Sequence, residues 1–397
     1  MNHTYPTITL HAGKDQSIRR FHPWVFSGAI KNVSDTIKEG DVVEVYSSNN
    51  QFLGTGHYQK GSIAVRLFSF EKIIADKFFW KKKIEKAYEL RTTLQLTHQT
   101  HTNVFRLVHG EGDEMPGLIM DFYNGTIVFQ AHSIGMYLMK EIIIEALRDV
   151  MGDKLKAVYD KSKETLPVAL STDAENGLIY GKSENNTILE NNNTFIVDWE
   201  TGQKTGFFID QRENRKLLSF YCKDKAVLNT FCYSGGFSVY AMNAGARLVH
   251  SVDSSKKAIE LTDKNMLLNS PASEKHQSFV ADTFTFLEKT NNEYDVIILD
   301  PPAFAKHQHT KHNAVKGYTR LNAEALRKIN TGGILFTFSC SQAVDTSSFN
   351  SAVMAAAIKV GRKVKILHHL SQPADHPVNI FHPEGEYLKG LVLYIEK

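Results

Sequence analysis

Val296–Leu299 (VIIL) is followed at once by Asp300–Pro302 (DPP), and Ile334–Phe338 (ILFTF) is followed by Ser339–Ser341 (SCS). Both apolar runs have the length and the β-branched or aromatic content of buried strands. In an open α/β sheet, ligands bind in the crevice beyond the carboxyl ends of the strands. A carboxylate, a rigid double proline and a thiol at such an edge therefore form a candidate active site.

The sequence around this stretch predicts the fold. From Ala226 to the end of the chain, strand patterns alternate with helix patterns. This alternation is typical of a doubly wound, largely parallel sheet, in which an antiparallel last strand is common. We predict an α/β, Rossmann-like domain over residues 191–397, and we interpret the Asn-rich span 185–193 as the linker before it.

The N-terminal part has a different pattern. Residues 4–70 consist of short apolar runs separated by glycines, which is typical of a small β-barrel or sandwich, and residues 73–190 read as a central α+β segment. Arg20 and Trp24 lie in a stretch that mixes cations with aromatic residues, as RNA-binding surfaces do. The alternative is that Trp24 belongs to the core and the arginines solvate a turn.

Composition limits the class of protein. The chain has 397 residues, enough for two or three domains, with 42% hydrophobic and 22% charged residues. No apolar run approaches the length of a membrane span, and no signal peptide is expected at the N-terminus. Three cysteines cannot make a disulfide framework, and no Cys-x-x-Cys suggests a metal site, so we expect a reduced, cytoplasmic setting. The net charge of +3 permits RNA binding without requiring it.

A second motif follows the first strand of the predicted sheet. The glycines of Phe231–Gly236 (FCYSGG) let the backbone approach a ligand closely at the start of a helix. Asp253 ends the next strand and can accept hydrogen bonds from both ribose hydroxyls, and Asp282 ends the third. This order suits an adenosyl ligand without a pyrophosphate, S-adenosylmethionine. The candidate cofactor-binding residues here are Phe231, Tyr233, Ser234, Gly235, Gly236, Asp253, Ser254 and Asp282.

These motifs together resemble class I S-adenosylmethionine-dependent methyltransferases. More narrowly, the chain resembles large-subunit ribosomal RNA cytosine-5 methyltransferases that carry an N-terminal PUA domain. The stretches that carry the resemblance are 20–30 (RFHPWVFSGAI), 111–123 (EGDEMPGLIMDFY), 204–214 (KTGFFIDQREN), 228–238 (LNTFCYSGGFS), 300–306 (DPPAFAK), 335–341 (LFTFSCS) and 372–390 (QPADHPVNIFHPEGEYLKG). The resemblance implies a PUA-like RNA-binding barrel at 1–72, a central domain at 73–190 and a methyltransferase domain at 191–397.

The resemblance also implies partners and a reaction. The partner would be 23S rRNA or a large-subunit assembly intermediate, with no membrane, and a homodimer is compatible with open sheet edges. Carbon 5 of cytosine becomes nucleophilic when a thiolate adds to carbon 6. Cys340 fits this role, because its flanking serines favour a polar crevice; the alternative is a buried small hydrophobe.

The remaining roles come from the resemblance. Asp300 would orient the exocyclic amine and N3 of the cytosine, on a loop stiffened by Pro301 and Pro302, with Phe304 also at the base. Asp210, Gln211 and Arg212 would close over the methionine end of the cofactor or over the base; the alternative is a helix cap. Residue 303 is Ala where many relatives carry a second cysteine, so the base that removes the carbon-5 proton stays open among Asp300, His376 and Glu384.

Two other functions stay open at this stage. The same scaffold could methylate a guanine nitrogen with Cys340 as a bystander, or it could be a non-catalytic RNA-binding assembly factor. The basic, His-rich span 306–320 has no cysteine or acidic partner for a metal, so we expect no metal site there. We interpret this span as a loop that contacts RNA phosphates, or else as a solvated loop.

Overall fold

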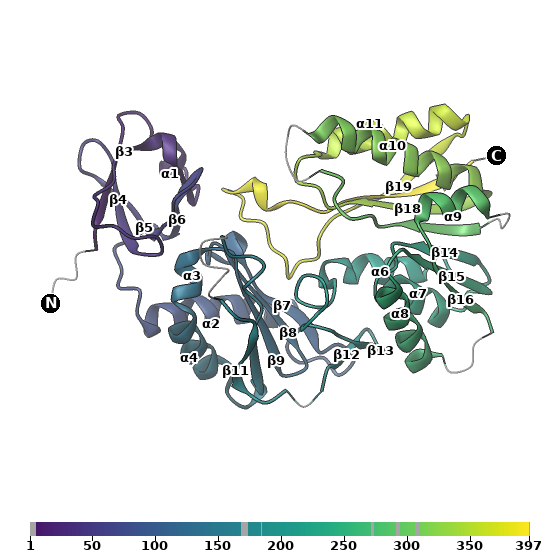
Figure 1. Cartoon of the computed structure of the whole chain (residues 1–397), viewed down its shortest axis with the longest axis horizontal. Coiled ribbons are helices and arrows are strands. Elements are labelled where there is room, and N and C mark those ends of the chain that lie inside the picture. Colours follow the sequence, from purple (N-terminus) through teal and green to yellow (C-terminus); the bar gives the residue numbers. More distant parts are fainter. Residues whose placement is uncertain are drawn as a thin grey trace. The chain divides into compact units, whose positions relative to one another are not determined.

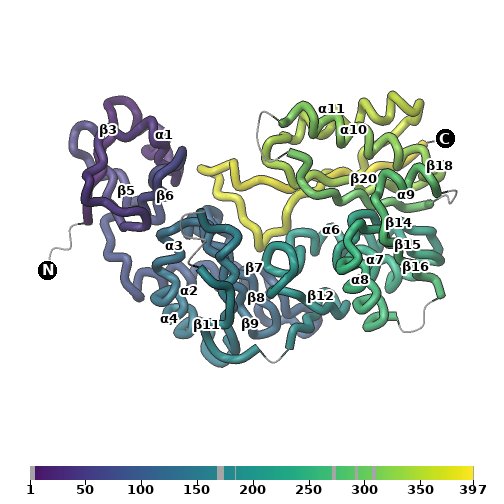
Figure 2. The backbone as a smooth tube through the Cα atoms, in the orientation of Figure 1, coloured from purple at the N-terminus to yellow at the C-terminus, as the bar shows by residue number. Residues whose placement is uncertain are grey.

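The computed structural model describes residues 5–167, 174–183, 185–270, 274–290, 294–305 and 310–396. The chain forms two compact units. The first comprises Met1–Ile188, Val197–Ile209 and Ala374–Gly385, and the second comprises Leu189–Ile196, Asp210–Pro373 and Glu386–Lys397. Figure 1 and Figure 2 show the course of the chain from the N-terminal strands to the yellow C-terminal segment.

The N-terminal part of the first unit is a six-stranded sheet in the order β2-β6-β5-β4-β1-β3. Its alternating apolar side chains, such as Val43, Val45 and Val65, form a core of their own, as the predicted barrel requires. The elements are β1 (Thr7–Leu10), α1 (Gln16–Arg19), β2 (Trp24–Phe26), β3 (Ile30–Asn32), β4 (Val42–Tyr46), β5 (Phe52–Tyr58) and β6 (Ile63–Ser69).

The rest of the first unit is a five-stranded sheet in the order β11-β10-β9-β8-β7, packed with helices. The first helix of this part is α2, whose N-cap Asp76 accepts a hydrogen bond from the backbone N–H of Phe79. Trp80 and Ile84 of α2 are fully buried. The elements are α2 (Lys77–Thr93), β7 (Val104–His109), β8 (Leu118–Tyr123), β9 (Thr126–Ala131), α3 (Ile134–Leu138), α4 (Lys140–Met151), β10 (Ala157–Asp160) and β11 (Gly177–Gly181).

A buried ionic network holds the C-terminal segment Ala374–Gly385 within the first unit. Arg91 pairs with Asp113 through both its terminal nitrogens, at 2.5 and 2.8 Å, and also donates to the carbonyl of Asp375 at 2.8 Å. The backbone N–H of Arg106 donates to the Asp375 carboxylate at 3.0 Å. Because buried charges are stable only when paired, these bonds fix the segment firmly.

The second unit is a seven-stranded sheet in the order β16-β15-β14-β17-β18-β20-β19. The strands from β14 to β18 pair in parallel, and β20 runs antiparallel to both its neighbours, which confirms the predicted α/β fold with an antiparallel last strand. The strands are β14 (Ala226–Thr230), β15 (Leu248–Asp253), β16 (His276–Val280), β17 (Tyr294–Leu299), β18 (Ile329–Ser339), β19 (Val364–Leu370) and β20 (Lys389–Ile395).

Helices cover both faces of this sheet (Figure 1). One layer holds α9, α10 and α11, which contact one another in sequence, and the other holds α6, α7 and α8. Strands β17 and β18 are buried on both faces of the sheet, which explains their continuous apolar sequence. The helices are α6 (Arg212–Ser219), α7 (Gly236–Asn243), α8 (Lys256–Asn269), α9 (Thr283–Lys289), α10 (Lys311–Lys328) and α11 (Thr346–Val360).

Three local predictions differ from the structure, the first of them only in part. The span interpreted as a linker does contain a boundary between the two units, between Ile188 and Leu189, but it consists of strand β12 (Thr187–Glu190) and a tight turn to β13 (Asn193–Ile196), because Asn191 and Asn192 adopt the left-handed conformation that asparagine tolerates. Residues 311–320 of the basic span form the first half of α10 rather than a loop, and residues 306–309 lie outside the described residues. Finally, the N-cap residue of α6, Gln211, makes no side-chain capping hydrogen bond, which contradicts the helix-cap alternative for residues 210–212.

No helix in the described part of the chain is long and apolar enough to cross a bilayer.

Candidate active site

The candidate residues of the second unit gather at one edge of its sheet. Because β14, β15, β16, β17 and β18 are parallel, their carboxyl ends share that edge. The chain order reverses between β14 and β17, which are hydrogen-bonded neighbours, and Thr230 Oγ1 donates to the carbonyl of Ile298 at 2.7 Å across them. Such a reversal is where open α/β sheets bind ligands.

The loop after β14 alternates between left-handed and ordinary backbone conformations. Phe231, Tyr233 and Gly235 have φ angles of 54°, 47° and 73°. A Cβ atom on Gly235 would lie 2.7 Å from Cγ2 of Thr262, so only glycine fits there. Ser234 is buried, and the loop ends at Gly236, the first residue of α7. Backbone N–H groups are thereby presented at a helix N-terminus, where acceptors bind.

Two acidic residues at neighbouring strand ends hold this edge together. Asp253 Oδ2 accepts from the backbone N–H of Tyr233 at 3.0 Å, and Oδ1 accepts from that of Ser255 at 2.9 Å. A carboxylate can accept about four hydrogen bonds, so Asp253 retains capacity for hydroxyl groups. Ser254 is exposed beside it. Asp282 is exposed and caps α9, accepting from the backbone N–H of Thr285 at 3.0 Å.

The loop after β17 meets the segment before α6. Gln211 Nε2 donates to Asp300 Oδ2 at 3.0 Å, and Gln211 Oε1 accepts from Asn214 at 2.6 Å. The structure therefore brings Gln211 to the Asp300 carboxylate and fixes its amide in one orientation. Pro301 is buried and Pro302 is exposed, so the two prolines present a rigid turn with one face open to solvent.

The thiol of Cys340 lies against the same loop. Cys340 follows the last residue of β18, is partly exposed, and its Sγ lies 3.9 Å from the carbonyl oxygen of Pro301. Because β17 and β18 are adjacent, the thiol and the Asp300 carboxylate come from neighbouring strand ends. The aspartate-proline turn and the thiol predicted from the opening stretch are thus together.

Buried polar bonds fix the residues on each side of Cys340. Ser339 Oγ donates to the Tyr318 hydroxyl at 2.9 Å, and Ser341 Oγ donates to the carbonyl of Ala305 at 2.6 Å. Burial raises the pKa of Tyr318 to about 12, so its hydroxyl is neutral near pH 7. Lys389, which opens β20, donates from Nζ to the carbonyl of Ser341 at 2.7 Å. The flanking serines are therefore structural.

Comparison with known proteins places this geometry in a family. Residues 8–70 match a PUA-like domain, and residues 170–378 match an S-adenosylmethionine-dependent methyltransferase domain. Over 391 residues the chain is 35% identical to ribosomal RNA large subunit methyltransferase I of Alteromonas mediterranea, covering 97% of this chain and 98% of that protein. It is 36% identical over 395 residues to the protein of the same name from Aeromonas hydrophila, covering 98% of each.

The chain belongs to the ribosomal RNA large subunit methyltransferase I family. A solved structure from Streptococcus mutans described as a SAM-dependent methyltransferase has the same fold, with a TM-score of 0.84, 24% identity and coverage of 98% of this chain and 100% of that one. Another methyltransferase structure, solved with SAH bound, gives a TM-score of 0.85 at 24% identity, with the same coverage. The PUA-like domain and the methyltransferase fold predicted from the sequence are confirmed.

The cofactor of this family member is S-adenosylmethionine. Its residues fit that molecule. The left-handed turn at 231–235 leaves glycine backbone where a ligand approaches, and the Asp253 carboxylate stands at the end of the next strand, as ribose recognition requires.

Three further predicted residues have contacts of their own in the second unit. Asp210 is buried and accepts from the Tyr387 hydroxyl at 2.8 Å, while Arg212 is buried and donates to Glu213 at 3.1 Å. Phe304 packs on Tyr318, with ring centroids 4.7 Å apart. The segment 209–212 is therefore held in place by side chains around it.

Arg20 and Trp24 lie in the first unit. Arg20 is exposed. Trp24 is half-buried; its Nε1 donates to Glu111 at 2.8 Å and its ring lies 4.3 Å from that of His382. Trp24 is thus half-buried with a structural contact, and the Arg20 side chain is open to solvent.

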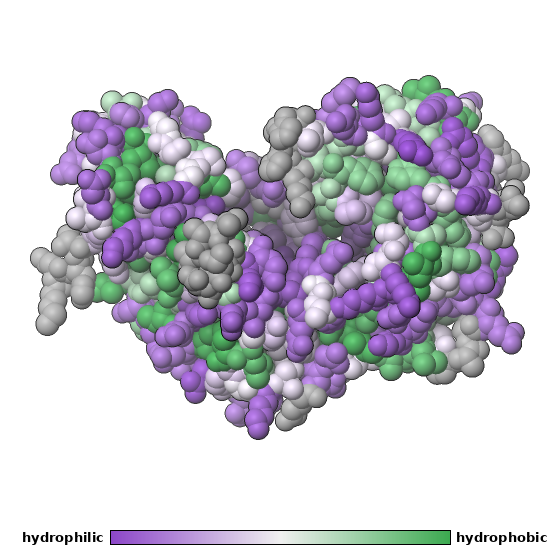
Figure 3. All heavy atoms as spheres, in the orientation of Figure 1, coloured by the Kyte–Doolittle hydropathy of each residue, from purple (hydrophilic) through white to green (hydrophobic). Residues whose placement is uncertain are grey.

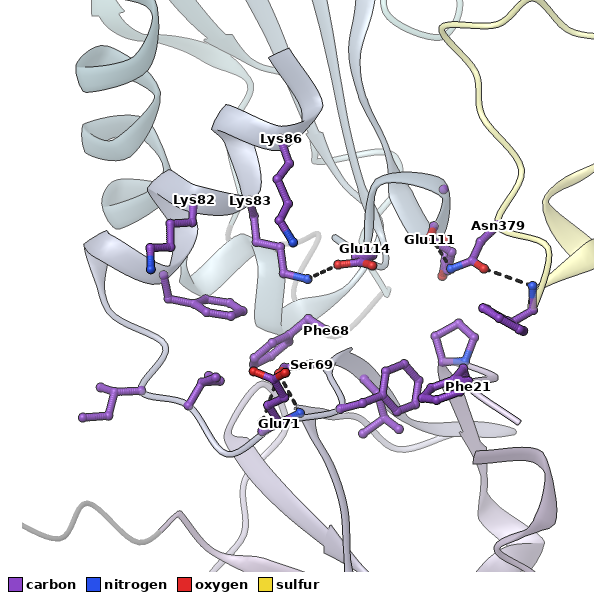
Figure 4. Close-up of a pocket in the computed structure, with 18 of the residues that line it drawn as sticks. Phe21, Phe68, Ser69, Glu71, Lys82, Lys83, Lys86, Glu111, Glu114 and Asn379 are labelled. Atoms are coloured by element: carbon purple, nitrogen blue, oxygen red, sulfur yellow. Dashed lines mark hydrogen bonds and ion pairs between the residues drawn. The ribbon is translucent and has the colours of Figure 1, made fainter. Parts of the chain in front are cut away.

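A groove of about 900 Å³ lies in the same unit between β6, α2 and the C-terminal segment (Figure 4). Phe21 and Phe381 are exposed on its walls with ring centroids 5.3 Å apart, and Lys83 pairs with Glu114 at 2.5 Å. Figure 3 shows hydrophobic residues interspersed with hydrophilic ones on the visible surface. The aromatic walls can stack bases, but the lysines share the groove with several carboxylates.

The two other candidates for the proton acceptor belong to the first unit. His376 is fully buried beside Asp375, with Nδ1 3.2 Å from that carboxylate. Glu384 lies 3.4 Å from His22 Nε2. His376 and Glu384 therefore each have a structural partner. Of the three candidates for the proton acceptor, Asp300 is the one located at the carboxyl edge of the sheet.

The sequence reasoning missed Lys389 and did not predict the contact between Gln211 and Asp300. Lys389 stands between Leu388 and Gly390 at the start of an apolar strand, where the side-chain alternation turns it inward. That single cation inside an apolar run was a usable signal. The bond from Gln211 to Asp300 spans 89 residues, and no local pattern indicates it.

Proposed function

We propose that this protein methylates carbon 5 of a cytosine in 23S rRNA through a covalent adduct with Cys340. The observation that carries the proposal is the position of the thiol, 3.9 Å from the Pro301 carbonyl and beside the cofactor edge of the sheet. The names of the relatives, ribosomal RNA large subunit methyltransferases, support the substrate class. When bound, S-adenosylmethionine supplies an electrophilic methyl group.

In the proposed mechanism, Cys340 acts first. The Sγ thiolate adds to carbon 6 of the cytosine, which moves electron density onto carbon 5 and makes it nucleophilic. Carbon 5 then accepts the methyl group. Loss of the carbon-5 proton to a base restores the double bond to carbon 6, and the carbon–sulfur bond breaks, which releases Sγ as the thiolate. Cys340 is therefore regenerated.

Asp300 orients the base. Its carboxyl group would hydrogen-bond the exocyclic amine and N3, and the Gln211 amide holds the carboxyl in place from the other side. Pro301 and Pro302 make this turn rigid, and Phe304 lines it. We assign removal of the carbon-5 proton to Asp300 or to water that it activates. Because a paired base cannot reach such an edge, the cytosine must be flipped out or unpaired.

The cofactor residues form the second part of the proposal. Phe231, Tyr233, Ser234, Gly235 and Gly236 would contact the methionine and adenosine parts through the loop backbone. Asp253 and Ser254 would bind the ribose, and Asp282 the adenine, while Asp210, Gln211 and Arg212 close the site beside them. Arg20, as the exposed cation, is a stronger candidate for an RNA contact than Trp24.

The proposal includes the organisation and setting of the chain. We retain a PUA-like part at 1–72, a central part at 73–190 and a methyltransferase part at 191–397. The partner is 23S rRNA or a large-subunit assembly intermediate in the cytoplasm, and a homodimer is part of the proposal that solution mass measurement can test.

Nucleoside mass spectrometry of 23S rRNA tests the proposal. A deletion strain should lack one 5-methylcytosine, which the native gene restores and the Cys340→Ala gene does not. If the missing nucleoside is a methylated guanine and Cys340→Ala restores it, the thiol mechanism is wrong. If no nucleoside changes and calorimetry shows no cofactor binding, the chain is a non-catalytic binding factor.

A further inference from the structure

Lys389 is a cation buried without a carboxylate partner. The residue is 6% exposed, and its Nζ donates one hydrogen bond, at 2.7 Å, to the carbonyl oxygen of Ser341. Among the described carboxylates, none forms an ion pair with it. A buried ammonium needs a compensating negative charge, because its desolvation is costly.

The charge that can compensate it is the thiolate of Cys340. The β18–β20 register pairs Lys389 with Ser339, and its ammonium bonds to Ser341, so it holds the loop on both sides of Cys340. Burial lowers the pKa of Lys389, and a negative charge on Cys340 acts in the opposite direction. Reactive cysteines are typically found beside such cations.

Two other described ionisable groups at this edge, Tyr318 and Asp300, carry no positive charge. Tyr318 is neutral near pH 7, because burial raises its pKa to about 12. The Asp300 carboxylate, on the next strand end, disfavours a thiolate. Glu386 and Asp345 act on Lys389 at longer range, and Asp345 is already paired with Lys311 at 2.5 Å.

We propose that Lys389 is a positioning residue that holds Cys340 as a thiolate, by fixing the Ser339–Ser341 loop and by placing its ammonium beside the sulfur. The thiol proton leaves to solvent and the lysine stays protonated, so an ammonium–thiolate pair forms. The catalytic consequence rests on the proposed function of Cys340, but the thiolate itself can be measured without any RNA.

The pKa of the Cys340 thiol can be measured in the native protein. Burial raises the pKa of Cys222 and of Cys232 to about 12, so neither reacts quickly with iodoacetamide below pH 9. The alkylation rate against pH should report one thiol, mapped to Cys340 by peptide mass spectrometry. Its apparent pKa should lie below the ordinary value of about 8.5. A value at or above 8.5 in the native protein overturns the proposal.

Two variants separate the charge from the hydrogen bond. Lys389→Gln keeps an N–H donor for the Ser341 carbonyl but removes the charge, and should raise the apparent pKa of Cys340 by about one unit, slowing alkylation at pH 7 about five- to tenfold. Lys389→Arg keeps the charge and should stay near the native value. Circular dichroism and S-adenosylhomocysteine calorimetry check that both variants fold. An unchanged thiol pKa in a folded Lys389→Gln overturns the proposal.

Failure of this proposal can be told from failure of the proposed function. If Cys340→Ala methylates rRNA at the native rate, Cys340 is not the nucleophile, whatever its pKa. If the pKa of the Cys340 thiol in the native protein is about 8.5 or higher, Lys389 does not activate Cys340. That conclusion holds whatever the methylation rate of Cys340→Ala.

Discussion

Cys232 and Cys340 stand at the same edge of one sheet and have opposite properties. Each follows a parallel strand, β14 or β18, by one or two residues. Cys232 is 6% exposed, and burial raises its pKa to about 12. Cys340 is partly exposed and lies beside the Asp300–Pro302 turn and Lys389. The comparison teaches that strand-end position alone does not set the properties of a thiol: burial raises the pKa of Cys232, whereas we propose that exposure and a neighbouring cation make Cys340 reactive.

The largest expected effect on activity comes from replacing Cys340 with alanine. Cys340→Ala should lower the single-turnover rate of methyl transfer to 23S rRNA by at least about a thousandfold, because the covalent step is lost. Cys232→Ala, the matched control from the same sheet edge, should stay within about threefold of native. Equal methyl-transfer rates for the two variants would show that Cys340 has no catalytic role that Cys232 lacks.

The second effect concerns the carboxylate that accompanies Cys340. Asp300→Asn should lower kcat/KM about a hundredfold, because the carboxylate assists addition and proton removal. Asp295→Asn is a suitable control, since Asp295 lies at the opposite end of β17, the strand that Asp300 follows, and accepts a hydrogen bond from the backbone N–H of Ala226. The control should lose stability rather than activity. A native rate for Asp300→Asn would remove Asp300 from the mechanism.

The third effect concerns the loop that carries Cys232. Gly235→Ala should weaken S-adenosylhomocysteine binding about tenfold and cost about 1–2 kcal/mol of stability, because Gly235 has φ +73° and no room beside Thr262. Gly245→Ala offers a control, since Gly245 has φ +88° and the nearest atom to its Cβ is 3.8 Å away. Calorimetry should show weaker binding for Gly235→Ala alone; equal affinities would contradict the assigned cofactor loop.

The smallest effect is expected in the stability of Cys232→Ala. Its sulfur contacts Thr262 at 3.5 Å in a buried site, so its loss should lower the free energy of unfolding by about 1 kcal/mol. Urea titration measures this. If Cys340→Ala were destabilised more than Cys232→Ala, Cys340 would be the structural cysteine of the two.

Much of this edge could be predicted from the sequence, because its signals are local. The apolar runs that end in Asp300–Pro302 and in Ser339–Ser341 indicate strands and their ends without help from distant residues. The glycine turn at 231–236 and the acid at Asp253 follow from the same alternation. Those four features are enough to predict the candidate site from the sequence.

The rest depends on contacts between distant residues. Asp375 receives hydrogen bonds from Arg91 and Arg106, 284 and 269 residues away, so the place of Ala374–Gly385 in the first unit has no local signature. The asparagines at 191 and 192 were mistaken for a linker because turn residues and linker residues share a composition. The role of Lys389 was overlooked because its hydrogen-bond partner, Ser341, lies in a loop 48 residues away.

The most direct test of the central claim is to trap the adduct. RNA transcribed with 5-fluorocytidine keeps a fluorine at carbon 5 that cannot leave as a proton does, so the carbon–sulfur bond should persist after methyl transfer. With this RNA and S-adenosylmethionine, the native protein should form a denaturant-resistant complex that peptide mass spectrometry maps to Cys340. Cys232→Ala should form it and Cys340→Ala should not. Absence of the complex with the native protein, on RNA that is methylated when it carries ordinary cytidine, would contradict the account.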